Sequence, residues 1–253
     1  SNLRTTISNL STNFYIESGD TEKAIEALDK SKANTDDADV KENNTIKIIG
    51  LKLEKKDYKD MEKYLGEISD PEERAYYSAQ YYAQKKDPKL VKEYETLLKS
   101  EKYKAYASKA LGDYYFDKKD LAKSKKYYGT HVSVNKNPDE YVLYRLGQAN
   151  EKENNLKMAL TDYKLVYEKK GKLAEDAMLR AAEIYDRQEN NVEAEKLFTK
   201  LYATKGNKDL KAYSIEKLIY YKLLNEKTKE AKKYYDELKK LDAKRAEKFK
   251  AYF

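Results

Sequence analysis

The sequence predicts an all-α protein, because its apolar residues recur at helical spacing and no stretch alternates between apolar and polar residues over about six positions. Two helical stripes show the spacing: Leu3, Ile7, Leu10 and Phe14, and Leu156, Leu160, Tyr163 and Tyr167. Only 8 of the 253 residues are Gly and 3 are Pro, so the signals for tight turns between strands are scarce.

The three prolines predict helix starts, since each follows a residue that can cap a helix: Asp70-Pro71, Asp87-Pro88 and Asn137-Pro138. Pro fits the first position of a helix, and the preceding Asp or Asn supplies an oxygen to the exposed N–H groups. Glu73 and Glu140 stand three residues after Asp70 and Asn137 and predict capping boxes there.

Short polar turns recur along the chain and predict a repeat of paired helices. Their last residues are 37, 30, 33, 35, 36 and 37 positions apart. About 14 helical residues precede each turn, and a second helix follows it. The turns are Ser18-Gly19-Asp20, Lys55-Lys56-Asp57, Lys85-Lys86-Asp87, Lys118-Lys119-Asp120, Glu153-Asn154-Asn155, Glu189-Asn190-Asn191 and Glu226-Lys227-Thr228.

The second helix of each predicted pair carries a small or apolar residue early and a bulky residue four positions later. The early residues are Ala24, Met61, Val91, Ser124, Ala159, Ala194 and Ala231. The bulky residues are Leu28, Leu65, Tyr128, Tyr163, Phe198 and Tyr235. The third pair has Glu95 in the bulky position, so we expect its register to be shifted by one residue.

This pattern resembles the tetratricopeptide repeat (TPR) family, whose unit is a helix-turn-helix of about 34 residues. The matching residues are Leu111-Gly112, Tyr115, Ser124 and Tyr128, then Leu146-Gly147, Ala159 and Tyr163, then Ala181-Ala182, Tyr185, Ala194 and Phe198. The resemblance covers the chain as about seven degenerate repeats and implies a right-handed α-solenoid. Gly112, Gly147 and Ala182 would let paired helices approach closely, while the aromatic residues of the second helices fill the gap to the next pair.

We expect residues 1–253 to form a single TPR-like array. The expected repeats are 3–32, 40–69, 71–100, 103–134, 138–170, 173–204 and 210–241. Residues 242–253 are expected to form one more helix, either a cap or the first half of a truncated repeat, with Ala243, Ala246 and Phe249 on one side.

Composition and motifs give no sign of an enzyme. The chain has no Cys, which excludes disulfides, thiolate metal sites and a Cys nucleophile. Its single His, His131, excludes a His-based metal cluster and is expected to have a structural role at a helix end. Gly171-Lys172 lacks the upstream Gly and the following Ser or Thr of a phosphate-binding loop. We therefore expect no catalytic, metal-binding or cofactor-binding residues.

The resemblance implies that the first helix of each repeat lines a concave groove that binds a segment of another protein. The family's groove positions correspond here to Tyr106 and Lys109, with Asp113 and Phe116, in the fourth repeat; to Tyr141, Tyr144, Arg145 and Gln148 in the fifth; to Arg180, Glu183 and Arg187 in the sixth; and to Tyr213, Lys217 and Tyr220 in the seventh. Tyr and Arg are frequent at interface hot spots. The alternative, left open by the sequence, is that several of these Tyr only pack between helices.

Some TPR proteins hold a C-terminal carboxylate with a Lys-Asn pair four residues apart. The corresponding pair here is Lys109 and Asp113, and an Asp repels a carboxylate. The groove is therefore expected to bind an extended or helical protein segment instead.

A second interpretation comes from charge. The net charge is +7, and the C-terminal segment, residues 201–253, itself carries +7, with Lys239, Lys240, Lys244 and Arg245 near its end. Such a segment would bind a polyanion or an anionic membrane surface. Nucleic acid is disfavoured as a partner, because 46 of the 52 basic residues are Lys and bidentate recognition of phosphates by Arg is nearly absent.

Location is predicted only by analogy. No apolar run reaches the roughly 18 residues that a membrane span needs, and no signal peptide is apparent, so membrane association would require an upstream anchor. Degenerate repeats rich in Lys and Tyr resemble bacterial arrays of cell-envelope assembly, which favours the envelope, with the cytoplasm as the alternative. Neither the partner's identity nor the oligomeric state follows from the sequence.

Overall fold

The computed structural model describes residues 2–205 and 207–253, with side chains from residue 10 onward. The described residues form helices and connecting turns, without a strand. They group into two compact units, residues 1–111 (unit 1) and residues 112–253 (unit 2). Helix α7 (Lys104–Asp117) contributes residues to both units.

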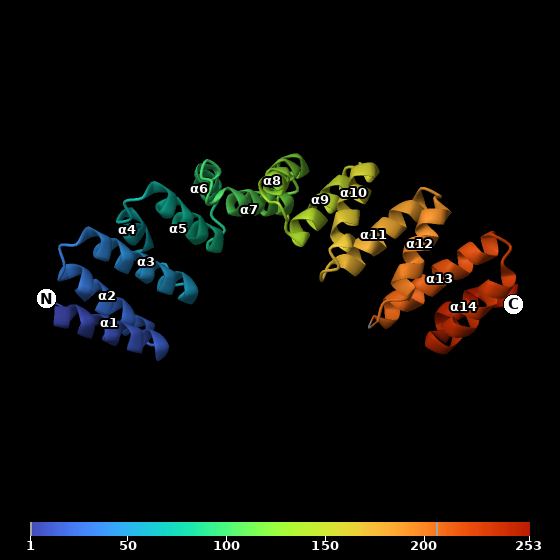
Figure 1. The fold of residues 1–253 in the computed structure, drawn as a ribbon, viewed down its shortest axis with the longest axis horizontal. Helices are drawn as coiled ribbons and strands as arrows, with labels where there is room; N and C mark the ends of the chain where they lie inside the picture. The colour runs from blue at the N-terminus through green and yellow to red at the C-terminus, as the bar shows by residue number, and fades with distance from the viewer. Residues whose placement is uncertain (1, 206) are drawn as a thin grey trace. The chain divides into compact units, whose positions relative to one another are not determined.

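The helices follow one another as antiparallel pairs, with α1 against α2, α5 against α6, α9 against α10, α11 against α12 and α13 against α14 (Figure 1). The second helix of a pair also contacts the first helix of the next, as α10 contacts α11. Unit 1 contains α1 (Asn2–Glu17), α2 (Thr21–Ala33), α3 (Ala38–Lys55), α4 (Met61–Gly66), α5 (Pro71–Gln84) and α6 (Leu90–Leu97). Unit 2 contains α8 (Leu121–Val134), α9 (Glu140–Lys152), α10 (Leu156–Glu168), α11 (Ala174–Arg187), α12 (Asn191–Tyr202), α13 (Lys208–Leu224), α14 (Thr228–Leu241), α15 (Ala243–Ala246) and the 3-10 helix η1 (Glu247–Tyr252).

Each of the seven predicted turns contains a residue in the left-handed conformation, which ends the first helix and reverses the chain. These residues are Gly19, Lys56, Lys86, Lys119, Asn154, Glu189 and Glu226. An Asp or Asn caps the next helix after several of them: Asp20 accepts from the Lys23 N–H, Asp120 from the Lys123 N–H, and Asn190 from the Glu193 N–H. The polar turns of the sequence are therefore helix stops followed by helix starts.

Replacing Lys119 by Gly is expected to raise the free energy of unfolding by about 0.5–1 kcal/mol, because Lys119 is exposed and has φ of 62°, where a side chain is strained. Gly19→Ala should have the opposite sign: Gly19 has φ of 76° and nothing within 4 Å of an added Cβ, so backbone strain alone would act. Urea titrations followed by circular dichroism would measure both. If both substitutions changed the free energy of unfolding in the same direction, backbone strain at these positions would not be the cause.

Only one of the three prolines starts a helix as predicted. Pro71 is the first residue of α5, and Asp70 accepts from the Glu73 N–H at 2.8 Å. Pro88 lies in a turn before α6, whose first residue is Leu90. Pro138 precedes α9, which begins at Glu140 with Asp139 as its cap, so the prediction of a start at Asn137-Pro138 was wrong by two residues.

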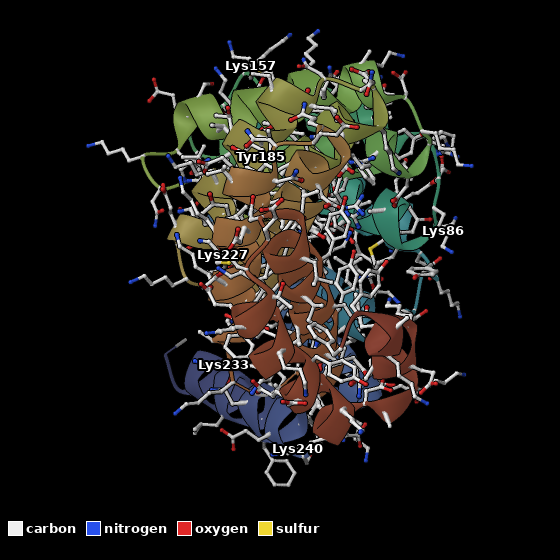
Figure 2. All side chains as sticks on the ribbon, turned by 90° about the vertical axis from the view of Figure 1, so that its right-hand side faces the viewer. Lys86, Lys157, Tyr185, Lys227, Lys233 and Lys240 are labelled. Atoms are coloured by element: carbon white, nitrogen blue, oxygen red, sulfur yellow. The ribbon has the colours of Figure 1, made fainter. Side chains whose placement is uncertain are left out.

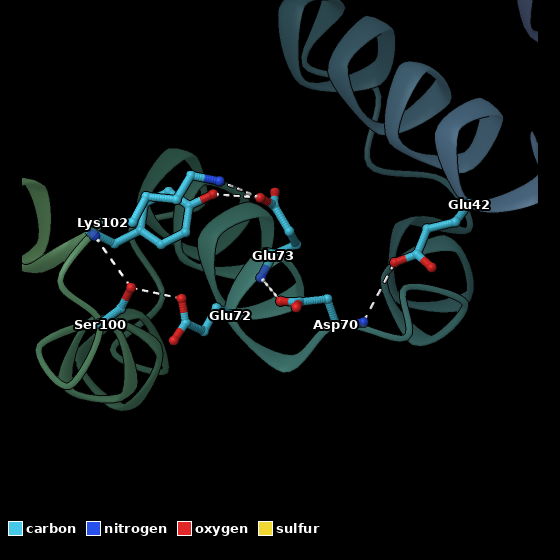
Figure 3. Close-up of polar contacts among 7 residues, drawn as sticks. Glu42, Asp70, Glu72, Glu73, Ser100 and Lys102 are labelled. Carbon is cyan, nitrogen blue, oxygen red and sulfur yellow. Dashed lines mark hydrogen bonds and ion pairs between the residues drawn. The ribbon is translucent and has the colours of Figure 1, made fainter. Parts of the chain in front are cut away.

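The predicted capping boxes are also wrong, because both glutamates bond to neighbouring segments. Glu73 Oε1 accepts from Lys102 Nζ at 2.6 Å and from the Tyr103 hydroxyl at 2.7 Å (Figure 3). The Asp70 N–H, which Glu73 would bond in a capping box, donates to Glu42 of α3 at 3.4 Å. Glu140 Oε1 accepts from the N–H of Leu173, just before α11. These carboxylates tie successive helix pairs together within each unit.

The repeat pattern of small and bulky residues coincides with the core. Its early small or apolar residues, Val91 excepted, and all six bulky residues are buried. In the third pair, Leu90 and Tyr94 are buried while Glu95 is exposed, which confirms the predicted one-residue shift of register. Tyr128 and Tyr163 are fully buried, and their rings lie against Gly112 and Gly147.

The two ends of the chain differ from expectation. Residues 242–253 form the four-residue helix α15 followed by η1 rather than one helix. Ala246 is buried, and the Phe253 ring stacks on Tyr235 at 4.9 Å, so the segment covers part of the last helix pair. In α1, Leu10 and Phe14 are each 64% exposed and do not form a buried stripe. The side chains of Leu3 and Ile7 lie outside the described residues.

Candidate partner-binding face

In unit 2, aromatic residues of the second helices bond to acids on the first helices. The Tyr128 hydroxyl of α8 donates to Asp113 of α7 at 2.6 Å, and the Tyr163 hydroxyl of α10 donates to Glu151 of α9 at 2.9 Å. Burial, together with the adjacent carboxylate, raises the pKa of both tyrosines. The same side chains that fill the gaps between helices therefore also fix acids at the C-terminal halves of the first helices.

The next helix pair has Phe198 in place of this tyrosine, so the hydroxyl is missing. Tyr221 of α13, whose ring lies 6.2 Å from that of Phe198, donates its hydroxyl to Asp186 of α11 instead. Asp186 stands four residues after Ala182, as Glu151 stands four residues after Gly147, so the acid keeps its place in the repeat although its donor comes from a different helix.

Two of these acids, Glu151 and Asp186, also pair with cations of the following first helix. Glu151, only 9% exposed, pairs with Arg180 at 3.0 Å and with Arg187 at 2.7 Å, both from α11. Asp186 pairs with Lys217 of α13 at 2.5 Å. In the last step, Glu216 of α13 pairs with Arg245 at 3.1 Å and Lys248 at 2.5 Å from the C-terminal segment. We use the name first-helix face of unit 2 for these residues together with the following: Asp113 and Phe116 of α7; Tyr141, Arg145, Gln148 and Lys152 of α9; and Tyr213, Tyr220 and Leu224 of α13.

Arg145 of α9 is held differently, by aromatic rings. Its Cζ lies 4.5 Å from the Phe116 ring centroid and 5.1 Å from that of Tyr141. Its Nε donates to the Tyr141 hydroxyl at 2.9 Å, and Nη1 donates to Gln148 at 3.4 Å. The structure therefore brings together the predicted residues Tyr141, Arg145 and Gln148.

A hollow of about 830 Å³ opens between α11, α13 and η1. Its walls include four predicted groove residues, Arg187, Tyr213, Lys217 and Tyr220. Tyr220 and Leu224 are 50% and 52% exposed, one helical turn apart on α13, and Phe249 of η1 also lines the hollow. The three cations in its walls, Arg187, Lys217 and Lys248, are each paired with an acid, so apolar side chains and ion pairs share the lining of the hollow.

The remaining predicted residues have other surroundings. Tyr144 packs on Tyr163, with ring centroids 5.6 Å apart, and Glu183 pairs with Arg180 at 3.7 Å. Tyr106 and Lys109 belong to unit 1, where Tyr106 packs against Tyr76 and Tyr94. The prediction overlooked Lys152, Leu224 and Phe249. Lys152 and Leu224 stand seven residues after Arg145 and Lys217, so helical spacing alone would have indicated them.

The basic C-terminal segment is partly neutralised. Arg245 pairs with both Glu216 and Asp242, and Lys232 pairs with Asp236. Lys233, Lys239, Lys240 and Lys244 are exposed, and Lys233 and Lys240 can be located in Figure 2. The charge available to a polyanion is therefore smaller than the sequence count indicates.

Among the described residues, no group of three His, Asp or Glu side chains is arranged to hold a metal ion. His131 is buried in the last turn of α8, where its carbonyl accepts from Asn135 Nδ2 at 2.7 Å. Within the same part of the chain, no helix has the length and apolar character to cross a membrane.

Neither the protein-family models nor the curated proteins contain a match to this sequence. Solved structures do resemble the fold. The C-terminal part of a TPR repeat-containing protein from Cytophaga hutchinsonii is 20% identical, with a TM-score of 0.69, over 93% of this chain and 96% of that one. A tetratricopeptide repeat protein from Parabacteroides merdae is 13% identical, with a TM-score of 0.53, over 94% of this chain and 93% of that one. The likeness shows an all-α solenoid of paired helices.

Proposed function

We propose that this chain, which has the fold of the tetratricopeptide repeat proteins, is a non-catalytic scaffold that binds a segment of another protein on the first-helix face of unit 2. The fold supports a protein-interaction scaffold in general terms. The hollow between α11, α13 and η1 is the observation that carries the more specific proposal, because two large apolar side chains remain half exposed at its wall.

The hollow suits an apolar side chain of a partner. Tyr220, Leu224 and Phe249 supply apolar contact area, and the ion pairs of Arg187, Lys217 and Lys248 lie in the same lining. Protein-binding hot spots commonly combine large side chains with such polar surroundings.

The test is a crosslinked pull-down from the source organism at low and high salt, with the wild-type chain and a Tyr220→Ala, Leu224→Ala double variant. We expect a discrete protein that is retained at high salt and whose affinity for the double variant is lower by roughly 30-fold. The matched control is Met158→Ala, Leu165→Ala on α10, which removes two apolar residues of similar exposure outside the hollow. Nucleic acid or lipid that is retained only at low salt, equally by all variants, would contradict the proposal and favour the C-terminal lysines.

For the setting, we propose cell-envelope assembly in a bacterium. Support comes from the absence of Cys and from the degenerate repeats rich in Lys and Tyr. Fractionation of the source cells with an antibody against the chain would test it, and recovery in the cytoplasm alone would refute it.

A further inference from the structure

Two cations of the first-helix face stand out because no described carboxylate pairs with them. They are Arg145 and Lys152, both on α9. Arg180, Arg187 and Lys217 on the same face each pair with an acid.

The two cations share one aromatic ring. Arg145 Cζ lies 4.5 Å and Lys152 Nζ lies 4.7 Å from the centroid of Phe116. Such cation–π contacts hold the positive groups in place without neutralising their charge. The hydrogen bonds of Arg145 to Tyr141 and Gln148 use Nε and Nη1 and leave the Nη2 group for a ligand. A cation fixed in this way loses little rotamer freedom when it binds an anion.

Two acids of this face, Asp113 and Glu151, are bound to other groups and form no ion pair with Arg145 or Lys152. Asp113 accepts the Tyr128 hydroxyl at 2.6 Å, and Glu151 is held by Tyr163, Arg180 and Arg187. Tyr141, Arg145, Gln148 and Lys152 follow one another at spacings of four, three and four residues, which places them on one side of α9. The charge of the pair is therefore presented on the same face that we assign to partner binding.

We propose that Arg145 and Lys152 bind a carboxylate side chain of the partner, so that the segment bound on this face is an acidic peptide. This inference rests on the proposed function and adds the chemistry of the partner to it. A guanidinium and an ammonium that contact one ring, with Nη2 of the guanidinium available, suit a carboxylate. Two cations are few for the closely spaced phosphates of a nucleic acid or a lipid surface, which larger sets of basic residues bind.

The experiment selects peptides from a displayed random library on the full chain. We expect the selected pool to be enriched in Asp and Glu, and a selected peptide to bind Arg145→Gln about tenfold more weakly. Changing the peptide's acidic residue to its amide should cause a similar loss with the wild-type chain and little further loss with Arg145→Gln. The control is Lys164→Gln, which removes an exposed cation of α10 outside the first-helix face, and this variant should bind the peptide as the wild type does.

The other outcomes separate this inference from the proposed function. Peptides without acidic enrichment that still require Tyr220 and Leu224 would overturn the inference alone. A library that yields no more binders on the wild type than on Tyr220→Ala, Leu224→Ala would overturn both. Duplex DNA or anionic vesicles that bind the wild type and fail to bind Arg145→Gln would assign the site to a polyanion, which overturns the acidic peptide.

Discussion

Gly112→Ala is expected to lower the free energy of unfolding by about 3 kcal/mol, even though Ala normally favours a helix over Gly by about 1 kcal/mol. A Cβ at Gly112 would lie 2.3 Å, 2.4 Å and 2.9 Å from three atoms of the Tyr128 ring. That ring cannot yield easily, because it is fully buried and its hydroxyl is fixed to Asp113. An added Cβ would therefore either push α7 and α8 apart or force Tyr128 out of its rotamer, and each of these changes would lose packing contacts.

The matched control is Gly129→Ala on α8, one residue after Tyr128, where an added Cβ meets nothing within 4 Å. This variant should be more stable than the wild type by about 0.5–1 kcal/mol, as expected from helix propensity alone. Urea titration followed by circular dichroism and Tyr fluorescence would compare the two. A stabilised Gly112→Ala protein would contradict the close contact between α7 and α8.

Asp162→Asn is expected to stabilise the protein at neutral pH by about 2–3 kcal/mol and to leave its stability at pH 4 nearly unchanged. Asp162 is 5% exposed on α10, and burial raises the pKa of its carboxyl to about 6, against the lowering effects of Asn150 and Lys125. Because the folded state binds this proton more tightly than the unfolded state, the contribution of Asp162 to stability is full below pH 4 and is lost as the pH rises through about 6. An Asn at this position stays neutral and can still accept from Asn150 Nδ2. In the wild type, Asn150 Nδ2 lies 2.7 Å from Asp162 Oδ2.

The measurement is the difference in unfolding free energy between variant and wild type from pH 3.5 to 7.5, since the difference cancels the titration of the other acids. Asp236→Asn serves as a control, because Asp236 is half exposed on α14 and pairs with Lys232 at the surface. A difference for Asp162→Asn that does not change with pH would show that its carboxyl titrates as it does in the unfolded chain.

Most of the fold could be predicted from short stretches of sequence. A turn such as Lys118-Lys119-Asp120 combines a helix stop with a cap, and both depend on the backbone of neighbouring residues. The small and bulky positions of the second helices, such as Ser124 and Tyr128, lie on one helical turn and are buried together. Even the irregular third pair followed this logic, because burial of Leu90 and Tyr94 preserves the four-residue spacing.

Two of the errors, the predicted capping boxes, concern residues whose partners lie far away in sequence. Glu73 has the spacing of a capping box, but Lys102 and Tyr103 compete for its carboxylate after the next helices have packed. Likewise, Glu140 bonds to Leu173. A local motif offers a carboxylate one hydrogen bond, and tertiary contact with a cation or several donors offers more.

In the candidate site, too, the sequence indicated which residues belong to the first helices but not which distant residues they contact. The resemblance to TPR proteins implied that Arg145, Arg187, Lys217 and Tyr220 line the groove formed by first helices, and the seven-residue spacing from Arg145 and Lys217 could have added Lys152 and Leu224. The sequence could not distinguish Arg145, which contacts rings, from Arg180 and Arg187, which pair with Glu151.

The sequence by itself determined the helices, the turns and the register of the repeat, because these depend on residues a few positions apart. Only the tertiary structure decided which charges are paired and which remain for a partner, because ion pairs such as Arg187 with Glu151 join residues 36 positions apart, brought together by helix packing.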